Sequence, residues 1–231
     1  MSMHDASPKL GDMSTSPHHV PSLALVRHGQ TDWNKERRFQ GSADVPLNAT
    51  GIEQARAAAE TLAADATSRW GSPWDVILTS PQLRARETAE IIAEHLGLEA
   101  PRVVAGLKER SYGPYEGRAY GDLDKETFTY LFPAHLPNVE EVEARGKELG
   151  ILEGVESSKD AGRRSATALA EALQRNPGQR VIAVSHGSTT RCLLNTLDEW
   201  NISNPGLRNC DIRYLTPAQE AHLHHIRSAL P

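Results

Sequence analysis

Residues 22–29 read SLALVRHG, an apolar run that ends abruptly in arginine, histidine and glycine. Because polar and apolar side chains do not alternate in it, the run predicts a strand buried on both faces, as in a parallel sheet. A second run of this kind, Val181–Ser185, is followed by His186 and Gly187. Histidine directly after a buried strand does not serve packing, and the glycine behind it would let a ligand approach the backbone closely.

Helical segments separate the predicted strands. Residues 50–53 have the spacing of a capping box, and the alanine-rich stretch through Ala64 predicts the helix behind it. Ser80 is expected to cap a helix that has Pro81 in its first turn. The other predicted elements are strands at Trp74–Thr79 and Val103–Val104 and helices at Glu156–Gln174 and Gly187–Leu197. Such alternation predicts an α/β fold, a three-layer α/β/α sandwich with a mostly parallel central sheet and right-handed crossovers.

Three regions lie outside this alternation. Residues 1–20 are polar and without a period, so they predict a disordered tail before a single domain at residues 21–231. Residues 107–154 are expected to be irregular. At the end of the chain, residues 211–215 and 222–226 predict two strands. On such a strand the three histidines would split between both faces, which favours a solvated strand over a zinc site formed by His222, His224 and His225.

Charge and cysteine content narrow the classes of function. The chain has 25 Lys plus Arg against 30 Asp plus Glu, a net charge of −5. This balance argues against general nucleic-acid or anionic-membrane binding, although a small anion needs only a few local cations. Two cysteines are too few for a disulfide framework. Because no apolar run of about 18 residues and no apolar secretory segment is present, we expect a cytoplasmic protein without membrane or nucleic-acid partners.

Arginines and histidines are expected to converge at one edge of the sheet. Ligands of open α/β sheets bind beyond the carboxyl ends of the strands. Arg27 and His28 follow the first strand, Arg84 lies one turn beyond the second, and His186 follows a third. Guanidinium groups match phosphate oxygens, and the following helix N-termini add free N–H groups. The sequence therefore predicts a phosphate pocket that contains an imidazole.

Five segments, in this order, resemble the histidine phosphatase superfamily, the phosphoglycerate mutase-like proteins. They span about residues 23–215 and read LVRHGQT (25–31), RFQG (38–41) with PLNATG (46–51), TSPQLRARET (79–88), LKE (107–109) and VSHG (184–187).

The resemblance implies a reaction and a role for each site residue. Neutral His28 would attack phosphorus and form a phosphohistidine, and nearby cations should lower its pKa. Arg27, Arg84 and His186 would hold the phosphoryl oxygens. Glu109 would protonate the leaving oxygen and later deprotonate water. Substrate would also contact Asn34, Gln40, Gly41 and Gly187. The resemblance requires no metal or other cofactor, and the implied ligand is a small phosphate ester.

Several residues have a second interpretation. Arg86 could replace Arg84, but the register after Thr79 favours Arg84. Glu116 lies on the same loop as Glu109, and Glu109 could instead form an ion pair with Lys108 or Arg110.

Other side chains are interpreted through packing and solvation. Tyr112, Tyr115 and Tyr120 fit an aromatic cover over the pocket as well as packing beneath a loop. A solvated helix face is the preferred interpretation of Arg163 and Arg164.

Within the family, the sequence favours a phosphatase over a mutase. Mutases hold a substrate carboxylate with basic residues after the acid/base segment, but residues 128–139 (FTYLFPAHLPNV) contain no Lys or Arg, which leaves only Arg118 and Lys125. Residues 154–157 (GVES) and 209–212 (NCDI) resemble the phosphatase branch, whereas 110–113 (RSYG) leans toward the mutases. We therefore predict a phosphomonoesterase, with a phosphoglycerate mutase or a non-catalytic phospholigand-binding module as alternatives.

Overall fold

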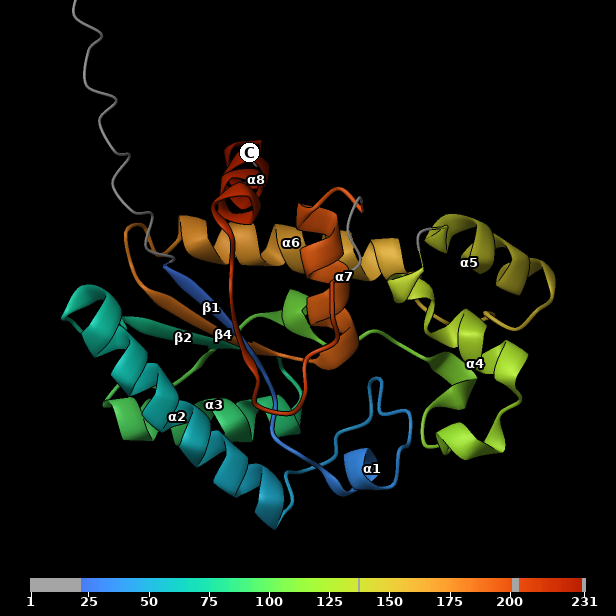
Figure 1. Ribbon diagram of the computed structural model, residues 1–231, viewed down its shortest axis with the longest axis horizontal. Helices are drawn as coiled ribbons and strands as arrows, with labels where there is room; N and C mark the ends of the chain where they lie inside the picture. The colour runs from blue at the N-terminus through green and yellow to red at the C-terminus, as the bar shows by residue number, and fades with distance from the viewer. Residues whose placement is uncertain (1–21, 137, 201–203, 230–231) are drawn as a thin grey trace, which may run out of the picture.

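The computed structural model describes residues 22–136, 138–200 and 204–229 (Figure 1). Within these ranges a central sheet has the strand order β3-β2-β4-β1-β5. The parallel strands are β1 (Leu23–Arg27), β2 (Val76–Thr79), β3 (Arg102–Val103) and β4 (Val181–Ser185), and β5 (Ile212–Tyr214) pairs antiparallel with β1. The predicted mostly parallel α/β sheet is confirmed. The tail predicted at residues 1–20 lies outside the described residues.

Helices cover both faces of this sheet and complete the three predicted layers (Figure 1). α2 (Ala49–Trp70) and α3 (Leu83–Leu96) pack on one face, against a core that includes Val26, Ile77 and Val184. α6 (Ser158–Gln174), α7 (Gly187–Leu197) and α8 (Pro217–Ser228) pack on the other, against Leu25, Leu78 and Ala183. Alternate residues of each strand therefore enter opposite cores, which is why the strand sequences are apolar throughout.

Helix boundaries differ from the predicted ones because other side chains supply the caps. α2 begins at Ala49, since the Asn48 side chain accepts a hydrogen bond from the Gly51 N–H, and it continues past Ala64 to Trp70. α3 begins at Leu83 with Gln82 at the cap position, so Ser80 does not cap it. α6 begins at Ser158, capped by Ser157.

The segment expected to be irregular contains two helices, α4 (Lys125–Leu131) and α5 (Val139–Glu148). It also contains short 3-10 turns, namely η1 (Ala105–Leu107), η2 (Gly113–Tyr115), η3 (Tyr120–Asp122) and η4 (Pro133–His135). Aromatic side chains of this segment surround the buried Phe39. The ring centroid of Phe39 lies 4.6 Å from that of Tyr120 and 5.3 Å from that of Phe132. The segment therefore folds around a core of its own beside the sheet, and its apolar positions follow that core (Figure 1).

The C-terminal prediction was half wrong. β5 lies within the first predicted strand, but residues 222–226 belong to α8. Thr216 and Gln219 form a reciprocal capping box with Pro217 at the first helical turn, and this start signal outweighs the alternating pattern behind it. None of the helices in the described ranges is long and apolar enough to cross a membrane.

Candidate active site

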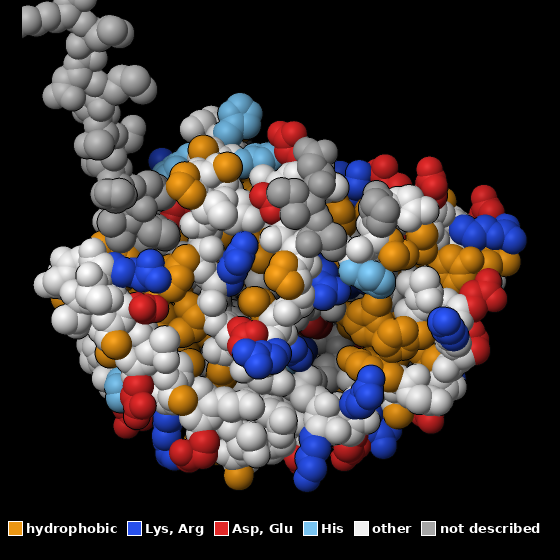
Figure 2. Space-filling model, in the orientation of Figure 1, with side chains coloured by type: hydrophobic (Ala, Val, Ile, Leu, Met, Phe, Trp, Pro, Cys, Tyr) orange, Lys and Arg blue, Asp and Glu red, His pale blue; other side chains and the backbone are white. Residues whose placement is uncertain are grey.

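The carboxyl ends of β1, β2 and β4 meet at one edge of the sheet. Arg27 lies opposite Ser185, and Thr79 lies opposite Val184, so the residues that follow the three strands emerge side by side. A cavity of about 170 Å³ opens there. Figure 2 shows this face hollowed, with Lys and Arg side chains at the edge of the hollow and hydrophobic side chains beside it. The predicted site residues that line the cavity are Arg27, His28, Asn34, Gln40, Gly41, Arg84, Glu109 and Gly187.

His28 is buried at the base of the cavity with its ring held in one tautomer. Nδ1 lies 2.7 Å from the carbonyl oxygen of Gly29, and because a carbonyl only accepts, Nδ1 carries the proton. Nε2 therefore keeps its lone pair. Burial holds the pKa of His28 well below its ordinary value, and the charges of Arg84 and Arg27 lower it further. The geometry leaves a neutral imidazole with a free lone pair.

Two guanidinium groups border this histidine and keep donors free. Arg84 is fully buried and donates to the carbonyl oxygens of Ala43 at 2.7 Å and Gly41 at 3.0 Å. Burial lowers the pKa of Arg84 to about 10, so it stays charged at neutral pH. Arg27 donates from Nη1 to the Leu207 carbonyl at 2.6 Å. Within the described part of the chain, Nε of each arginine is buried without a partner, which suits an incoming anion.

The alternative arginine, Arg86, is half-buried and does not line the cavity. It lies two residues beyond Arg84, on a different face of α3, because a helix turns about 100° per residue.

His186 stands behind His28 and does not itself line the cavity. The two ring centroids are 5.1 Å apart, with 57° between the ring planes. Nε2 of His186 lies 2.7 Å from Oγ of Ser80, two residues before the cap position of α3. Nδ1 is buried with no partner among the described residues. Burial, together with Arg84, holds the pKa of His186 well below its ordinary value.

Glu109 lines the cavity from the segment that follows η1, and its carboxylate lies at the N-terminus of α7. Its Oε1 accepts from the N–H of Thr189 at 2.9 Å and from the Thr189 hydroxyl at 3.0 Å. Its Oε2 lies 3.4 Å from the N–H of Ser188. A carboxylate at a helix N-terminus is stabilised by the free N–H groups there. Glu109 is the one carboxylate among the cavity-lining residues of the described chain, beside four arginines.

The competing interpretations of Glu109 do not fit this structure. Glu116 does not line the cavity, and its carboxylate accepts from the Tyr112 N–H at 3.0 Å and from the Ser42 hydroxyl at 2.5 Å. The Arg110 side chain is buried and pairs with Glu143 at 3.4 Å instead of with Glu109. Glu116 therefore supports the loop, while Glu109 faces the cavity.

The remaining predicted residues shape the cavity wall. Asn34, on the short helix α1 (Asp32–Lys35), accepts from the Asn209 side chain at 3.2 Å, and Gln40 has a buried Oε1 with no partner among the described residues. Gly41 has a φ of +48°, and a Cβ there would collide with the Glu116 carboxylate. A Cβ at Gly187 would approach Cζ of Arg27 to 3.3 Å.

Gly29 does not serve the predicted close approach of a ligand to the backbone. A Cβ at this position would lie 2.5 Å from the backbone oxygen of Gly51, so the glycine permits a close approach of two backbone segments. It is packing against α2, not ligand access, that requires glycine behind His28.

Aromatic side chains form the outer wall. Tyr112, Tyr120 and Phe132 line the cavity, whereas Tyr115 packs away from it and donates to the Ile151 carbonyl at 2.9 Å. Both interpretations of the tyrosines are therefore partly correct.

Two further arginines, Arg38 and Arg191, line the cavity and were not predicted. Arg118 and Lys125 do not line it. Arg38 is committed to Glu36 at 2.5 Å and to the Gly117 carbonyl at 2.9 Å. Arg191 lies one turn beyond Gly187 on α7, a spacing that could have revealed it.

Cations elsewhere in the fold also differ from expectation. Arg163 is solvated as predicted, with 73% of its side chain exposed, but Arg164 forms a half-buried ion pair with Glu156. The described residues contain no group of three or more His, Cys, Asp or Glu that could hold a metal ion.

Known proteins resemble this chain in sequence. The phosphatase PhoE of Bacillus subtilis (strain 168), which is uncharacterised, is 36% identical over 179 residues, 77% of this chain and 78% of that protein. The probable phosphoglycerate mutase GpmB of Salmonella paratyphi C (strain RKS4594) is 35% identical over 191 residues, 81% of each chain.

A solved mycobacterial glucosyl-3-phosphoglycerate phosphatase, complexed with VO3, matches this structure with a TM-score of 0.65. Its sequence is 27% identical, and the match covers 82% of this chain and 90% of that one. The phosphatases among these similar proteins confirm the predicted class of activity, phosphoric monoester hydrolysis. Residues 23–224 match the profile of the histidine phosphatase superfamily, branch 1, and the chain therefore belongs to that superfamily.

Proposed function

We propose that this enzyme hydrolyses a small phosphate monoester in two steps, through a phosphohistidine formed on Nε2 of His28. The observation that carries the proposal is the hydrogen bond from Nδ1 of His28 to Gly29, which leaves a neutral nucleophile facing an arginine-lined cavity. A nucleophile in this state needs no prior deprotonation.

In the first step, Nε2 of His28 attacks phosphorus and the bond to the leaving oxygen breaks. Glu109 in its protonated form gives that oxygen a proton, so the product leaves as an alcohol. Arg27 and Arg84 hold the equatorial oxygens, since both lie at the cavity with unpartnered Nε atoms. Nδ1 of His186, which is buried and unpartnered in the described structure, is assigned as a donor to another phosphoryl oxygen, with the Ser80 hydroxyl donating to Nε2 so that Nδ1 carries the proton.

In the second step, water attacks phosphorus and the bond to His28 breaks. Glu109, now a carboxylate, takes the proton of the attacking water. Inorganic phosphate departs, and both side chains return to their initial protonation states.

The substrate we propose is a phosphate ester that carries a second anionic group. Among the described residues, Nε of Arg191 is buried without a partner and Arg191 has no acidic partner, although its side chain lines the cavity. A Cβ at Gly206 would lie 2.4 Å from Nη2 of Arg191, so the missing side chain makes room for this guanidinium. Arg27 and Arg84 match the phosphoryl charge, which leaves Arg191 for the second anion.

Phosphoryl transfer is the second candidate function, because GpmB is a probable mutase of similar identity. A mutase would pass the phosphoryl group from His28 to another hydroxyl before water arrives. Hydrolysis is favoured, since residues 128–139 supply no basic side chain and neither Arg118 nor Lys125 lines the cavity.

We also propose that the enzyme acts in the cytoplasm on small molecules and not on nucleic acid. The net charge of −5 supports the exclusion of nucleic acid, because general nucleic-acid binders carry an excess of basic residues. The four arginines that line the cavity match a small anion instead. Cell fractionation and a nucleic-acid binding assay at low salt would test it.

The decisive experiment traps the covalent intermediate. A slow ester labelled in the phosphoryl group should label the wild-type enzyme with an acid-labile phosphoryl group, and peptide mapping should place it on His28. His28→Ala should remain folded, take no label and turn over no substrate. Label on a serine, or full activity in His28→Ala, would refute the nucleophile.

A screen of phosphate esters, with and without 2,3-bisphosphoglycerate, separates hydrolysis from transfer. Released phosphate that does not depend on the bisphosphate supports the phosphatase, whereas exchange between phosphoglycerates supports the mutase.

A further inference from the structure

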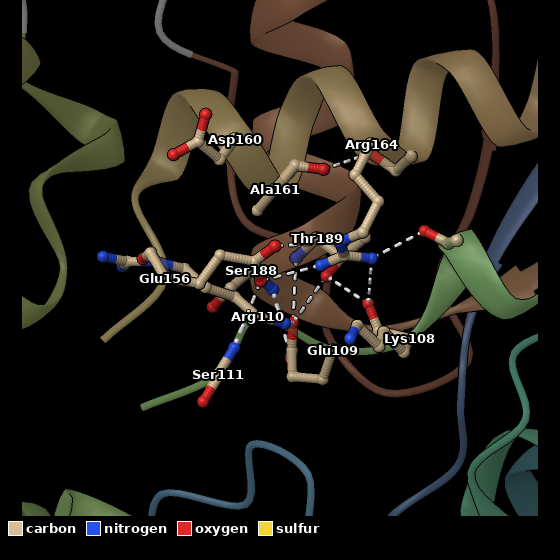
Figure 3. A network of polar contacts seen from close by, with 12 residues as sticks. Lys108, Glu109, Arg110, Ser111, Glu156, Asp160, Ala161, Arg164, Ser188 and Thr189 are labelled. Atoms are coloured by element: carbon tan, nitrogen blue, oxygen red, sulfur yellow. Dashed lines mark hydrogen bonds and ion pairs between the residues drawn. The ribbon is translucent and has the colours of Figure 1, made fainter. Parts of the chain in front are cut away.

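An ion pair between Glu156 and Arg164 lies directly behind the segment that carries Glu109 (Figure 3). Nε and Nη2 of Arg164 each donate to one carboxylate oxygen of Glu156, both at 2.8 Å. Only about a fifth of either side chain is exposed, at 21% and 20%. Two parallel bonds of this kind define the direction of both side chains as well as their distance.

The remaining donors and acceptors of the pair hold the backbone on both sides of Glu109. Nη1 of Arg164 donates to the carbonyl oxygens of Gly106 at 2.6 Å and Lys108 at 3.1 Å. The Glu156 carboxylate accepts from the Ser111 N–H at 3.3 Å.

The main-chain carbonyl of Glu156 adds a further contact, because it accepts from Nε of Arg110 at 2.6 Å. Lys108, immediately before Glu109, is thus bonded to Arg164, and Ser111, two residues after it, to the Glu156 carboxylate.

The segment that carries Glu109 packs closely against α6. A Cβ at Gly106 would lie 2.2 Å from Cβ of Ala168, so the backbone at Gly106 rests directly against the helix. On the opposite side, Thr189 of α7 holds both the Glu109 carboxylate and the Lys108 carbonyl, the latter at 2.9 Å. Glu109 is therefore held between α6 and α7 (Figure 3).

We propose that the Glu156–Arg164 ion pair is a positioning element that orients Glu109 toward the leaving oxygen. The inference rests on the proposed role of Glu109 as the general acid. Removing one partner of a largely buried ion pair destabilises a fold, but a loss of folded enzyme lowers the rates for all substrates alike. A displacement of about 1 Å at a reacting group can slow a reaction about a hundredfold. A positioning role is therefore recognised by a loss of rate that depends on the leaving group.

The test compares two esters in matched variants. Arg164→Ala should slow hydrolysis of an alkyl phosphate about ten- to a hundredfold, because its leaving oxygen needs a well-placed proton. Phosphorylation of the enzyme by an activated aryl phosphate, whose leaving oxygen needs little help, should change less than about threefold. Affinity for orthovanadate should be unchanged, since Arg27 and Arg84 are untouched.

The matched control is Arg163→Ala. Arg163 is the next residue on α6, with 73% of its side chain exposed and an ion pair to Asp160. Arg163→Ala should leave the rates with the alkyl and the aryl phosphate at their wild-type values. Glu156→Gln, which preserves the size of the side chain, should show the pattern of Arg164→Ala and serves if that variant is unstable. Arg164→Lys keeps the positive charge but lacks the paired guanidinium donors, so its activity should lie between those of Arg164→Ala and the wild type.

A double variant separates this inference from the proposed function. In a Glu109→Gln background, Arg164→Ala should cause no further loss, because both changes remove the same proton transfer. An equal loss on both esters, or a loss that multiplies with that of Glu109→Gln, would refute the positioning role alone. If Glu109→Gln itself shows no dependence on the leaving group, the general-acid assignment fails, and the positioning role fails with it.

Discussion

His28 and His186 follow two neighbouring parallel strands, and their ring centroids lie 5.1 Å apart, with His28 at the cavity and His186 buried behind it. Both imidazoles are kept neutral, chiefly by burial and then by the charge of Arg84. Two neutral rings beside two guanidinium groups form a site in which the arginines carry the charge and the histidines supply lone pairs and oriented N–H groups.

Glu109→Gln should slow alkyl phosphates by about two to four orders of magnitude, the usual contribution of general acid–base catalysis. With an activated aryl phosphate, phosphohistidine formation should persist, but its hydrolysis should lag, so a burst of the aryl alcohol should appear in rapid-mixing experiments. Glu116→Gln is the matched control, since Glu116 bonds to the loop and not to the cavity. Leaving-group dependence in Glu116→Gln instead would mean that the wrong carboxylate was assigned.

Acid should destabilise the fold through the two histidines. Their pKa values are lowered on folding, so below about pH 6.5 the unfolded chain binds protons that the folded chain excludes. The free energy of unfolding is therefore independent of these histidines above about pH 6.5. Below that pH it falls by up to about 1.4 kcal/mol per pH unit for each histidine.

Urea unfolding between pH 7 and 5 measures this slope. In His186→Gln the free energy of unfolding should decrease less steeply with falling pH than in the wild type. The difference in slope should correspond to at most one bound proton. An identical slope would show that His186 takes up a proton in the folded state.

Arg191→Gln should weaken binding of esters that carry a second anionic group. A charged hydrogen bond contributes about 1.5–3 kcal/mol, so KM should rise about ten- to a hundredfold for such esters. An aryl phosphate without a second charge provides the internal control and should keep its KM. A uniform change for both esters would place Arg191 on the phosphoryl group.

Chelation should leave the rate unchanged. In the proposed mechanism Arg27 and Arg84, which both line the cavity, supply two positive charges to the transferring phosphoryl group. Activity is measured after dialysis against EDTA and again after Mg²⁺, Mn²⁺ or Zn²⁺ is added. Loss of activity that a divalent ion restores would contradict the metal-free mechanism.

The structure corrects the sequence analysis where several signals competed locally. Residues 222–226 alternate like a strand, yet the capping box at Thr216 and Gln219 starts a helix through them. Arg163 and Arg164 are adjacent and identical in type, but only Arg164 lies over Glu156. Periodicity and propensity describe neighbours along the chain, so they cannot say which exposed-looking residue finds a distant partner.

The sequence by itself determined the sheet and the base of the site. Uniformly apolar runs at residues 23–26 and 181–184 require burial on both faces, and parallel strands bring their carboxyl ends together, which places His28, Arg84 and His186 at one edge. The family resemblance of residues 107–109 favoured Glu109 over Glu116, but only the tertiary structure decided how Glu109 is held at the cavity and that Arg191 lines it without an acidic partner among the described residues. Glu109 is held by Thr189, 80 residues away, and contacts at that separation depend on how α6 and α7 pack, not on any local pattern.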